Sequence, residues 1–159
     1  MINYKQTPPL FHYSKAPYLV EIFDTGKIQL ATAGVPVGER PAVWLSSDPW
    51  IEWTAYPQAS AEELEQSEYQ PVRFCLDPAA LLCGATMVVP WLKHRKLCRM
   101  DTRYADGLEA SGRALGADYR SWWCSYEPIS VKHFTTVEML INSKWVVIAY
   151  REEATCCRN

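Results

Sequence analysis

The sequence predicts an α+β fold: a compact single domain with a mostly antiparallel sheet and peripheral helices. β-Favouring segments occur early and late in the chain, helical patterns lie between them, and strands and helices do not alternate regularly. A chain of 159 residues normally builds one hydrophobic core. We therefore expect one domain over residues 1–159, in which residues 1–9 form an N-terminal arm and residues 151–159 a C-terminal tail.

The first predicted element is a β-favouring run, residues 10–13, that leads into an amphipathic helix. Ser14 is a candidate N-cap for this helix, and Gly26 supplies its left-handed stop. The apolar face of the helix would consist of Leu19, Ile22 and Phe23.

Two further strands are predicted at residues 27–31 and 42–46, separated by a Gly- and Pro-rich loop at 34–38. Residues 57–70 are polar and crowded with glutamates, which indicates a solvated surface segment. A strand with alternating apolar residues follows at 71–76.

The second half of the chain carries more helices and the late strands. Pro90 opens a short helix, and Asp101 is the predicted N-cap of a longer helix that ends at Gly116. Asp118 caps a turn that carries the Trp122–Trp123 pair. The late strands are predicted at residues 129–131, 136–141 and 145–150, with a hairpin turn at Asn142-Ser143.

Composition restricts the class of protein. The net charge of −2 argues against indiscriminate nucleic-acid binding, which needs a broad basic surface. The N-terminal residues are polar, and no run approaches the roughly 18 apolar residues of a membrane span. We therefore expect a soluble, cytoplasmic protein that does not enter a membrane. The six cysteines, including Cys156 and Cys157 in the tail, form no CxxC pair, which favours reduced thiols and does not predict a metal site.

Side chains of two early strands are candidates for ligand contact. His12 can hold a sugar hydroxyl, with Tyr13 and Ser14 beside it, or can be a buried histidine satisfied by the backbone. Trp44 and Ser46 share one face of their strand, an arrangement that suits an aromatic heterocycle bearing an amide. Trp44 as a core residue is the open alternative.

A second aromatic group follows closely. Trp50 and Trp53 are three residues apart and would share one face of a helix. Glu52 lies between them as a partly desolvated carboxylate that could position a substrate. We therefore predict that Glu52 and Trp53 belong to the ligand site.

The run Leu10–Ser14, the helix that ends at Gly26 and the run Val43–Ser46 resemble the N-terminal half of the ADP-ribosyltransferase superfamily. The closer branch is its His–Tyr–Glu group, of the diphtheria-toxin type. The resemblance is confined to the N-terminal third of the chain, and the remainder agrees only in its α+β character. It implies a split sheet and NAD as the substrate, without a metal.

In that family a first-strand histidine holds the ribose of NAD, and an aromatic residue stacks on nicotinamide. A late glutamate stabilises the oxocarbenium-like transition state as nicotinamide leaves. The resemblance gives the first role to His12 and the second to Trp44, with or without Tyr13, although the second position is usually tyrosine. Glu127 is the first candidate for the glutamate and Glu138 the second.

The resemblance implies a mono-ADP-ribosyltransferase or related NAD-consuming enzyme that acts on a protein or nucleic-acid acceptor, for example as a toxin. Two alternatives remain open. One is a non-catalytic nucleotide- or partner-binding module that uses the same pocket, for example in phage–host conflict. The other is an RNA 2′-phosphotransferase-like enzyme. The basic residues Lys93, Arg95 and Lys96 could contact phosphate or form a solvated helix face.

Overall fold

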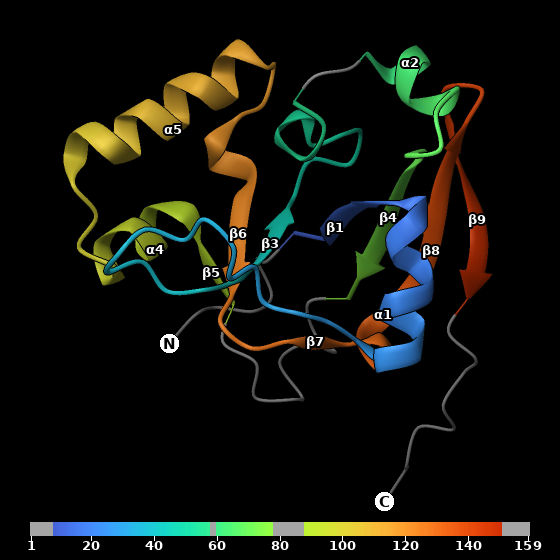
Figure 1. Ribbon diagram of the computed structural model, residues 1–159, viewed down its shortest axis with the longest axis horizontal. Helices are drawn as coiled ribbons and strands as arrows, with labels where there is room; N and C mark the ends of the chain where they lie inside the picture. The colour runs from blue at the N-terminus through green and yellow to red at the C-terminus, as the bar shows by residue number, and fades with distance from the viewer. Residues whose placement is uncertain (1–7, 58–59, 78–87, 151–159) are drawn as a thin grey trace, which may run out of the picture.

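The computed structural model describes residues 8–57, 60–77 and 88–150, and it confirms the predicted α+β fold (Figure 1). The main sheet consists of seven strands: β1 (Leu10–Lys15), β3 (Val43–Ser46), β4 (Pro71–Leu76), β5 (Val88–Pro90), β6 (Trp122–Ser125), β8 (Phe134–Ile141) and β9 (Lys144–Tyr150). They lie in the order β5-β6-β3-β1-β4-β8-β9, and every neighbouring pair is antiparallel. The predicted tail and most of the predicted arm lie outside the described residues.

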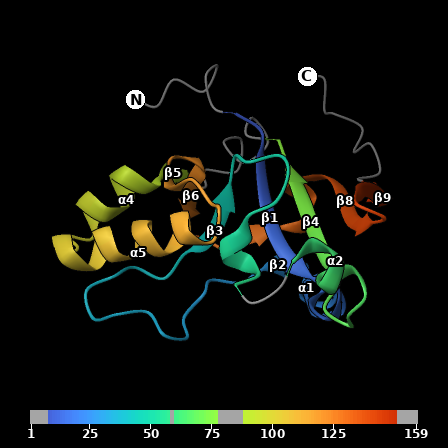
Figure 2. The ribbon, with the colours of Figure 1, turned by 90° about the horizontal axis from the view of Figure 1, so that it is seen from above.

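Helices accompany both ends of this sheet. They are α1 (Leu19–Thr25), α2 (Ala61–Glu65), α4 (Trp91–Leu97) and α5 (Thr102–Ala114). Helices α4 and α5 lie at the end formed by β5 and β6, whereas α1 and α2 lie toward β4 and β8 (Figures 1 and 2). A small second sheet pairs β2 (Lys27–Ile28) with β7 (Ile129–Ser130). None of the helices in the described ranges is long and apolar enough to cross a bilayer.

The main sheet is split between β1 and β3. Strand β1 pairs with β4 along its full length, and β3 pairs with β6 at all four of its residues. In contrast, β1 and β3 are in register at one position only, where Phe11 lies opposite Ser46. The sheet therefore forms two halves, β5-β6-β3 and β1-β4-β8-β9, that meet at a narrow junction.

Apolar packing holds the two halves together. Val43 and Leu45 of β3 belong to the same buried cluster as Val72 and Phe74 of β4. Ile22 of α1 joins this cluster, so the apolar face of the helix is anchored beneath the sheet. Because burying one such side chain contributes roughly 1.5–3 kcal/mol, the junction does not depend on backbone hydrogen bonds alone.

Several element boundaries follow from capping and turn residues. At the start of α5, the Asp101 side chain accepts a hydrogen bond from the backbone N–H of Tyr104 at 3.1 Å. Gly26 ends α1 in the left-handed region, with φ of 70°. Asn142 and Ser143 also have positive φ, 49° and 57°, and form the tight turn between β8 and β9. These local predictions are confirmed.

Two local predictions are wrong. Ser14 does not cap a helix, because β1 continues to Lys15 and a 3₁₀ turn at Ala16–Tyr18 precedes α1. The Trp122–Trp123 pair does not lie in a turn. It begins β6, which finds pairing partners on both sides, in β3 and β5. A run this short reads as a strand only once its neighbours are known.

The glutamate-rich segment contains a helix that the solvated-segment interpretation did not include. Ser60 and Glu63 form a capping box at the start of α2: the serine side chain accepts from the Glu63 N–H, and the glutamate accepts from the Ser60 N–H. Leu64 is buried against the sheet, whereas Glu62 remains exposed. Leu64 and the hydrogen bond from the Ser143 N–H to Glu65 Oε1, at 2.8 Å, hold this short helix against the sheet.

Candidate functional site

A cavity of about 470 Å³ opens at the junction between the two halves of the sheet. Its lining comes from β1, β3 and β6, from helices α4 and α5, and from the segment around the 3₁₀ turn Trp53–Ala55. Aromatic side chains dominate its walls: Phe11, Tyr13, Trp44, Trp91 and Trp122. A concave site of this size with aromatic walls is typical of small-molecule binding.

His12 of β1 lines this cavity and also bridges the junction. Its Nδ1 lies 2.9 Å from the backbone carbonyl oxygen of Trp44 in β3. Because a carbonyl oxygen only accepts hydrogen bonds, Nδ1 carries the proton and Nε2 carries a lone pair. Burial lowers the pKa of His12, which favours the neutral ring. Nε2 has no hydrogen-bond partner among the described residues, and the centroid of the imidazole lies 6.1 Å from that of the Phe74 ring.

The Trp44 indole forms one wall and is held by aromatic neighbours. Its ring centroid lies 5.9 Å from that of Trp91 and 5.4 Å from the imidazole of His94, which meets it edge-on. His94 is completely buried; its Nδ1 lies 2.8 Å from the Tyr126 hydroxyl, and its Nε2 lies 3.3 Å from Glu39 Oε1. Trp44 is therefore both a packed residue and a cavity wall, which combines the two interpretations left open by the sequence.

Glu52 supplies a buried carboxylate to the same cavity. Its exposed fraction is 7%, and it is the acidic residue of the cavity lining within the described part of the chain. Oε1 accepts hydrogen bonds from the hydroxyl of Thr54 at 2.7 Å and from its N–H at 3.3 Å, which caps the 3₁₀ turn. Oε2 is buried and has no hydrogen-bond partner among the described residues. Such an oxygen is costly to leave unpaired.

Ser46 and Tyr13 line the cavity, but their hydroxyl groups are engaged within the protein. Ser46 Oγ accepts from the Asp48 N–H at 3.1 Å and lies 3.2 Å from Ser121 Oγ. The Tyr13 hydroxyl donates to the Asp48 carbonyl at 2.5 Å, and burial raises the pKa of this phenol. Both residues therefore shape the site and hold the loop at Asp48.

The other two predicted ligand residues, Ser14 and Trp53, do not line the cavity. The backbone carbonyl of Ser14 accepts a hydrogen bond from the Tyr56 hydroxyl, so this residue ties β1 to the following loop. Trp53 packs near Gly116, where a Cβ on the glycine would lie 3.4 Å from the indole Cδ1. Both residues support the elements around the site.

Neither late glutamate lies in the cavity lining. Glu127 follows β6 and is exposed. In the β3–β6 pairing, Ser46 lies opposite Trp122, beside the cavity, and Val43 lies opposite Ser125. Glu127 comes two residues after Ser125, so it lies beyond the end of the β3–β6 pair that is farther from the cavity. The structure thus places Glu52, rather than Glu127, in the same cavity lining as His12.

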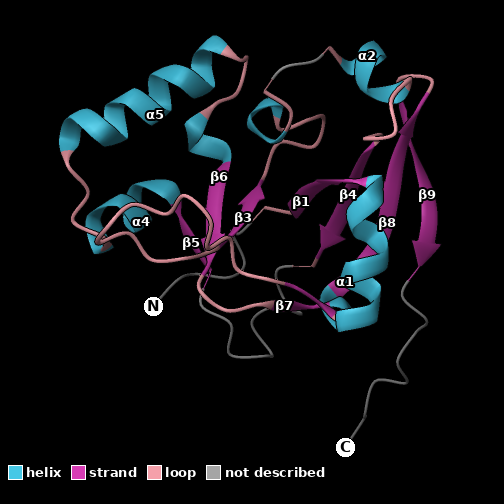
Figure 3. Ribbon diagram, in the orientation of Figure 1, coloured by secondary structure: helices cyan, strands magenta, loops and turns pink. Residues whose placement is uncertain are grey.

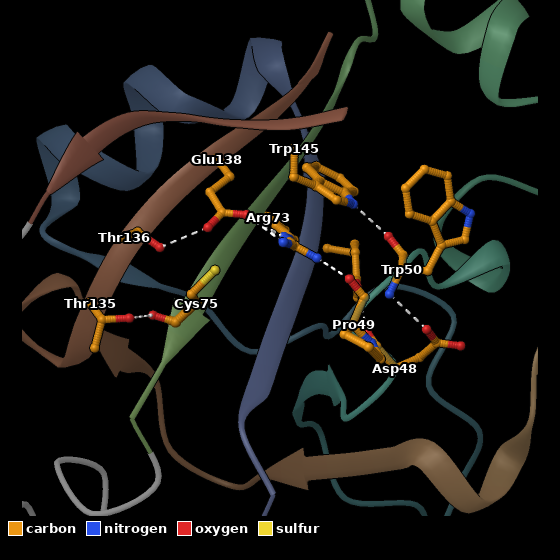
Figure 4. A network of polar contacts seen from close by, with 10 residues as sticks. Asp48, Pro49, Trp50, Arg73, Cys75, Thr135, Thr136, Glu138 and Trp145 are labelled. Atoms are coloured by element: carbon orange, nitrogen blue, oxygen red, sulfur yellow. Dashed lines mark hydrogen bonds and ion pairs between the residues drawn. The ribbon is translucent and has the colours of Figure 1, made fainter. Parts of the chain in front are cut away.

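Glu138 forms an ion pair with Arg73 in a polar network on the other half of the sheet (Figure 4). The guanidinium Nη2 lies 2.5 Å and Nε 2.7 Å from Glu138 Oε2, and the guanidinium also donates to the carbonyl of Pro49. Trp145 of β9 donates its indole N–H to the carbonyl of Trp50 at 2.6 Å. These contacts fasten the segment 49–50, which is separated from Glu52 by Ile51 alone, to the sheet.

No protein-family model, curated protein or solved structure matches the chain. The assignment of a function therefore rests on the geometry of the cavity itself. Among the residues that the structure describes, no group of three or more His, Cys, Asp or Glu side chains is arranged to hold a metal ion.

The basic residues of α4 do not line the cavity. Arg95 pairs with Asp106 and Glu109 of α5, with its Nη1 2.7 Å from Glu109 Oε1. Lys93 and Lys96 are exposed. No lysine or arginine appears in the cavity lining across the described ranges. The loop between β2 and β3 reaches α4, where Glu39 contacts His94 (Figure 3). A phosphate site in the cavity therefore has no basic side chain to build it.

Sequence reasoning missed the helical wall of the cavity, which comes from α5. Its residues share one face of the helix at spacings of three, one and three: Leu108, Ser111, Gly112 and Leu115. That spacing was the available signal. Gly112 allows close packing, because a Cβ at this position would lie 2.5 Å from Trp122 Cζ2.

Proposed function

We propose that the chain is an NAD-consuming enzyme of the ADP-ribosyltransferase type that binds the nicotinamide riboside half of NAD in the junction cavity. One observation carries this proposal. His12, a histidine that burial keeps neutral, and Glu52, a buried carboxylate, both contribute to the lining of the same aromatic cavity. Ribose hydroxyls, a flat heterocycle and a developing positive charge are the ligand features that these groups complement.

Each group has a distinct role in the proposed reaction. His12 Nε2 accepts a hydrogen bond from a ribose hydroxyl and fixes the sugar against the junction. Trp44 stacks on the nicotinamide ring. The bond between ribose C1′ and the ring nitrogen breaks, both electrons pass to nitrogen, and C1′ becomes positively charged. Glu52 stabilises this charge until a nucleophile of the acceptor bonds to C1′ and releases its proton.

In this proposal Glu52 takes the role for which the family resemblance made Glu127 the first candidate. The position of a carboxylate relative to the reacting carbon decides its electrostatic effect, which falls with distance and with exposure to water. Glu52 is buried at the cavity, whereas Glu127 is exposed and lies outside it. The acceptor in this proposal is a protein or a nucleic acid.

The cavity supports an NAD-consuming enzyme better than an RNA 2′-phosphotransferase. Transfer of a phosphate requires cationic groups that converge on it. Within the described residues the cavity lining holds none, and Arg95 is already paired. A non-catalytic nucleotide-binding module remains the second candidate, because the same aromatic walls could bind a heterocycle without breaking a bond.

The test is calorimetric titration of the protein with NAD, followed by mass detection of free nicotinamide. We expect binding and slow nicotinamide release. Glu52→Gln should lower the rate of release by about 10²–10³-fold, the usual effect of removing one transition-state contact. His12→Asn is the second variant. The asparagine amide can still donate a hydrogen bond to the Trp44 carbonyl, as Nδ1 does, but it has no atom at the position of Nε2.

Glu21→Gln serves as the matched control, because Glu21 is exposed on α1 and does not line the cavity. Glu127→Gln decides between the two carboxylates: if it abolishes release and Glu52→Gln does not, the role belongs to Glu127. Binding of NAD without release in any condition would favour the binding module. Absence of binding would refute the NAD-consuming enzyme.

A further inference from the structure

We propose that the junction cavity selects a positively charged N-alkylpyridinium ring over its neutral counterpart, with Glu52 as the counter-ion. This selectivity rests on the function proposed above, because the nicotinamide ring of NAD is such a cation. The ring becomes neutral when it leaves ribose or when it is reduced to the dihydropyridine. The cavity would therefore hold the substrate more tightly than the released product.

The first support is the uncompensated carboxylate. Both hydrogen bonds to Glu52 come from one residue, Thr54, and both reach Oε1. Oε2 has no partner in the described part of the chain, and the cavity lining described above contains no basic side chain. A desolvated carboxylate oxygen without a partner is unfavourable, so a ligand that brings positive charge gains more than a neutral one of the same shape.

The second support is the composition of the walls. The indoles of Trp44, Trp91 and Trp122 line the cavity together with the rings of Phe11 and Tyr13. The faces of aromatic rings carry negative potential and attract cations, and tryptophan does so most strongly. A planar cation can stack on such a face while its charge remains close to the carboxylate. A compact alkylammonium gains the charge interaction but not the stacking area.

The third support is that, among the described residues, no unpaired cationic side chain lines the cavity beside Glu52. His12 donates through Nδ1 and is kept neutral by burial, which lowers its pKa. The charges of Arg73 and Glu52 both act on the Tyr13 hydroxyl. The Arg73 guanidinium, however, is paired with Glu138 at 2.5 Å, and Arg73 does not line the cavity. The negative charge of Glu52 thus remains available to a ligand.

The proposed selectivity is compatible with catalysis. When the bond between C1′ and the ring nitrogen breaks, the positive charge moves by one bond length, from the ring to the sugar. One carboxylate near that bond can therefore interact with the charge in the substrate and in the transition state. Only the neutral product loses the interaction, which promotes its release.

The experiment compares two small probes that lack ribose: 1-methylnicotinamide, a cation, and nicotinamide, its neutral relative. Their affinities for the full-length chain are measured by calorimetry, with tryptophan fluorescence as a second readout. We expect 1-methylnicotinamide to bind at least about tenfold more tightly, as desolvated cation–aromatic contacts of this kind allow. Equal affinities for the two probes on the unmodified protein would overturn the proposal without any variant.

Glu52→Gln keeps the shape of the side chain and the acceptor for Thr54 but removes the charge. The affinity ratio should fall to near one, whereas the affinity for nicotinamide should stay within about twofold, because only the charge term is lost. Glu21→Gln, an exposed site on α1, should leave the ratio unchanged. A ratio that survives in Glu52→Gln would overturn the role of the carboxylate, provided that the thermal unfolding of the variant shows it to be folded.

Two further arms separate this inference from its foundation. Tetramethylammonium should bind more weakly than 1-methylnicotinamide, and equal or tighter binding would overturn the pyridinium as the preferred cation. Nicotinamide release from NAD is scored independently. Release without selectivity between the probes overturns the inference and leaves the proposed enzyme standing. Selectivity without release supports the cationic site and refutes the enzyme.

Discussion

Gly112 offers a direct test of whether the aromatic wall of the cavity is rigid. This glycine lies in α5 against the indole of Trp122, and a Cβ added to it would lie 2.5 Å from Cζ2 and 2.7 Å from Cη2. Both atoms belong to an inflexible ring that is almost completely buried. The Trp122 ring also packs edge-on against Trp91, with centroids 5.6 Å apart. Gly112→Ala must therefore displace either the indole or the helix.

The magnitude follows from two opposing effects. Alanine in place of glycine inside a helix stabilises it by about 0.8–1.0 kcal/mol. Forcing an extra methyl group into a packed interior costs about 1–3 kcal/mol. Gly107 lies in the same helix, and a Cβ there would have no atom within 4 Å. Since the helix term is common to both variants, their difference isolates the packing term.

We expect Gly112→Ala to have a free energy of unfolding about 1–3 kcal/mol lower than that of Gly107→Ala. The assay is urea denaturation followed by tryptophan fluorescence, with both variants compared with the unmodified chain. Gly107→Ala should be slightly more stable than the unmodified protein. If Gly112→Ala proves as stable as Gly107→Ala, the Trp122 indole moves freely, and the rigid aromatic wall on which the site depends does not exist.

Two further predictions concern charge. Burial lowers the pKa of His94 from its ordinary 6.5, against the opposing hydrogen bond and charge of Glu39, so the folded chain binds fewer protons than the unfolded one below that pH. The stability contributed by neutral His94 is therefore present above about pH 6.5 and falls progressively below it. Urea midpoints measured at several pH values should decline less steeply toward acid in His94→Gln than in the unmodified chain. An identical decline in the two proteins would show that His94 is not the origin of the effect. Arg73→Met leaves Glu138 largely buried without its partner and frees Pro49, so we expect a loss of about 3 kcal/mol in unfolding free energy by the same assay. A change within about 0.5 kcal/mol, as at an ordinary exposed site, would show that the pair does not hold the loop.

Local chemistry explains the parts of the fold that the sequence predicted. A cap at Asp101, a left-handed glycine at position 26 and a tight turn at Asn142-Ser143 each depend on residues within one turn of chain, and each is found in the structure. The strand at β6 depends on something else. Its four residues have no distinctive alternation, and only pairing with β3 on one side and β5 on the other makes them a strand.

The same distinction separates the site residues. Trp44 and Ser46 could be placed on one strand from their spacing, and both line the cavity. The choice between Glu52 and Glu127 could not be made in this way. It depends on the register of β6 against β3, which places Glu127 beyond the end of the β3–β6 pair that lies away from the cavity. It also depends on the hydrogen bonds from Arg73 and Trp145 to the backbone carbonyls of Pro49 and Trp50, which fasten the segment before Glu52. Those are long-range contacts with no local signature.

His12 shows why a structural and a functional interpretation of one residue need not compete. The two halves of the sheet share one registered pair between β1 and β3, and the bond from His12 Nδ1 to the Trp44 carbonyl adds a second link across that junction. The same bond fixes the tautomer, and therefore makes Nε2 a hydrogen-bond acceptor. The junction thus orients the histidine, and the histidine reinforces the junction. A variant such as His12→Ala would remove both effects together, whereas His12→Asn, which can keep the bond to Trp44 but has no Nε2, separates them.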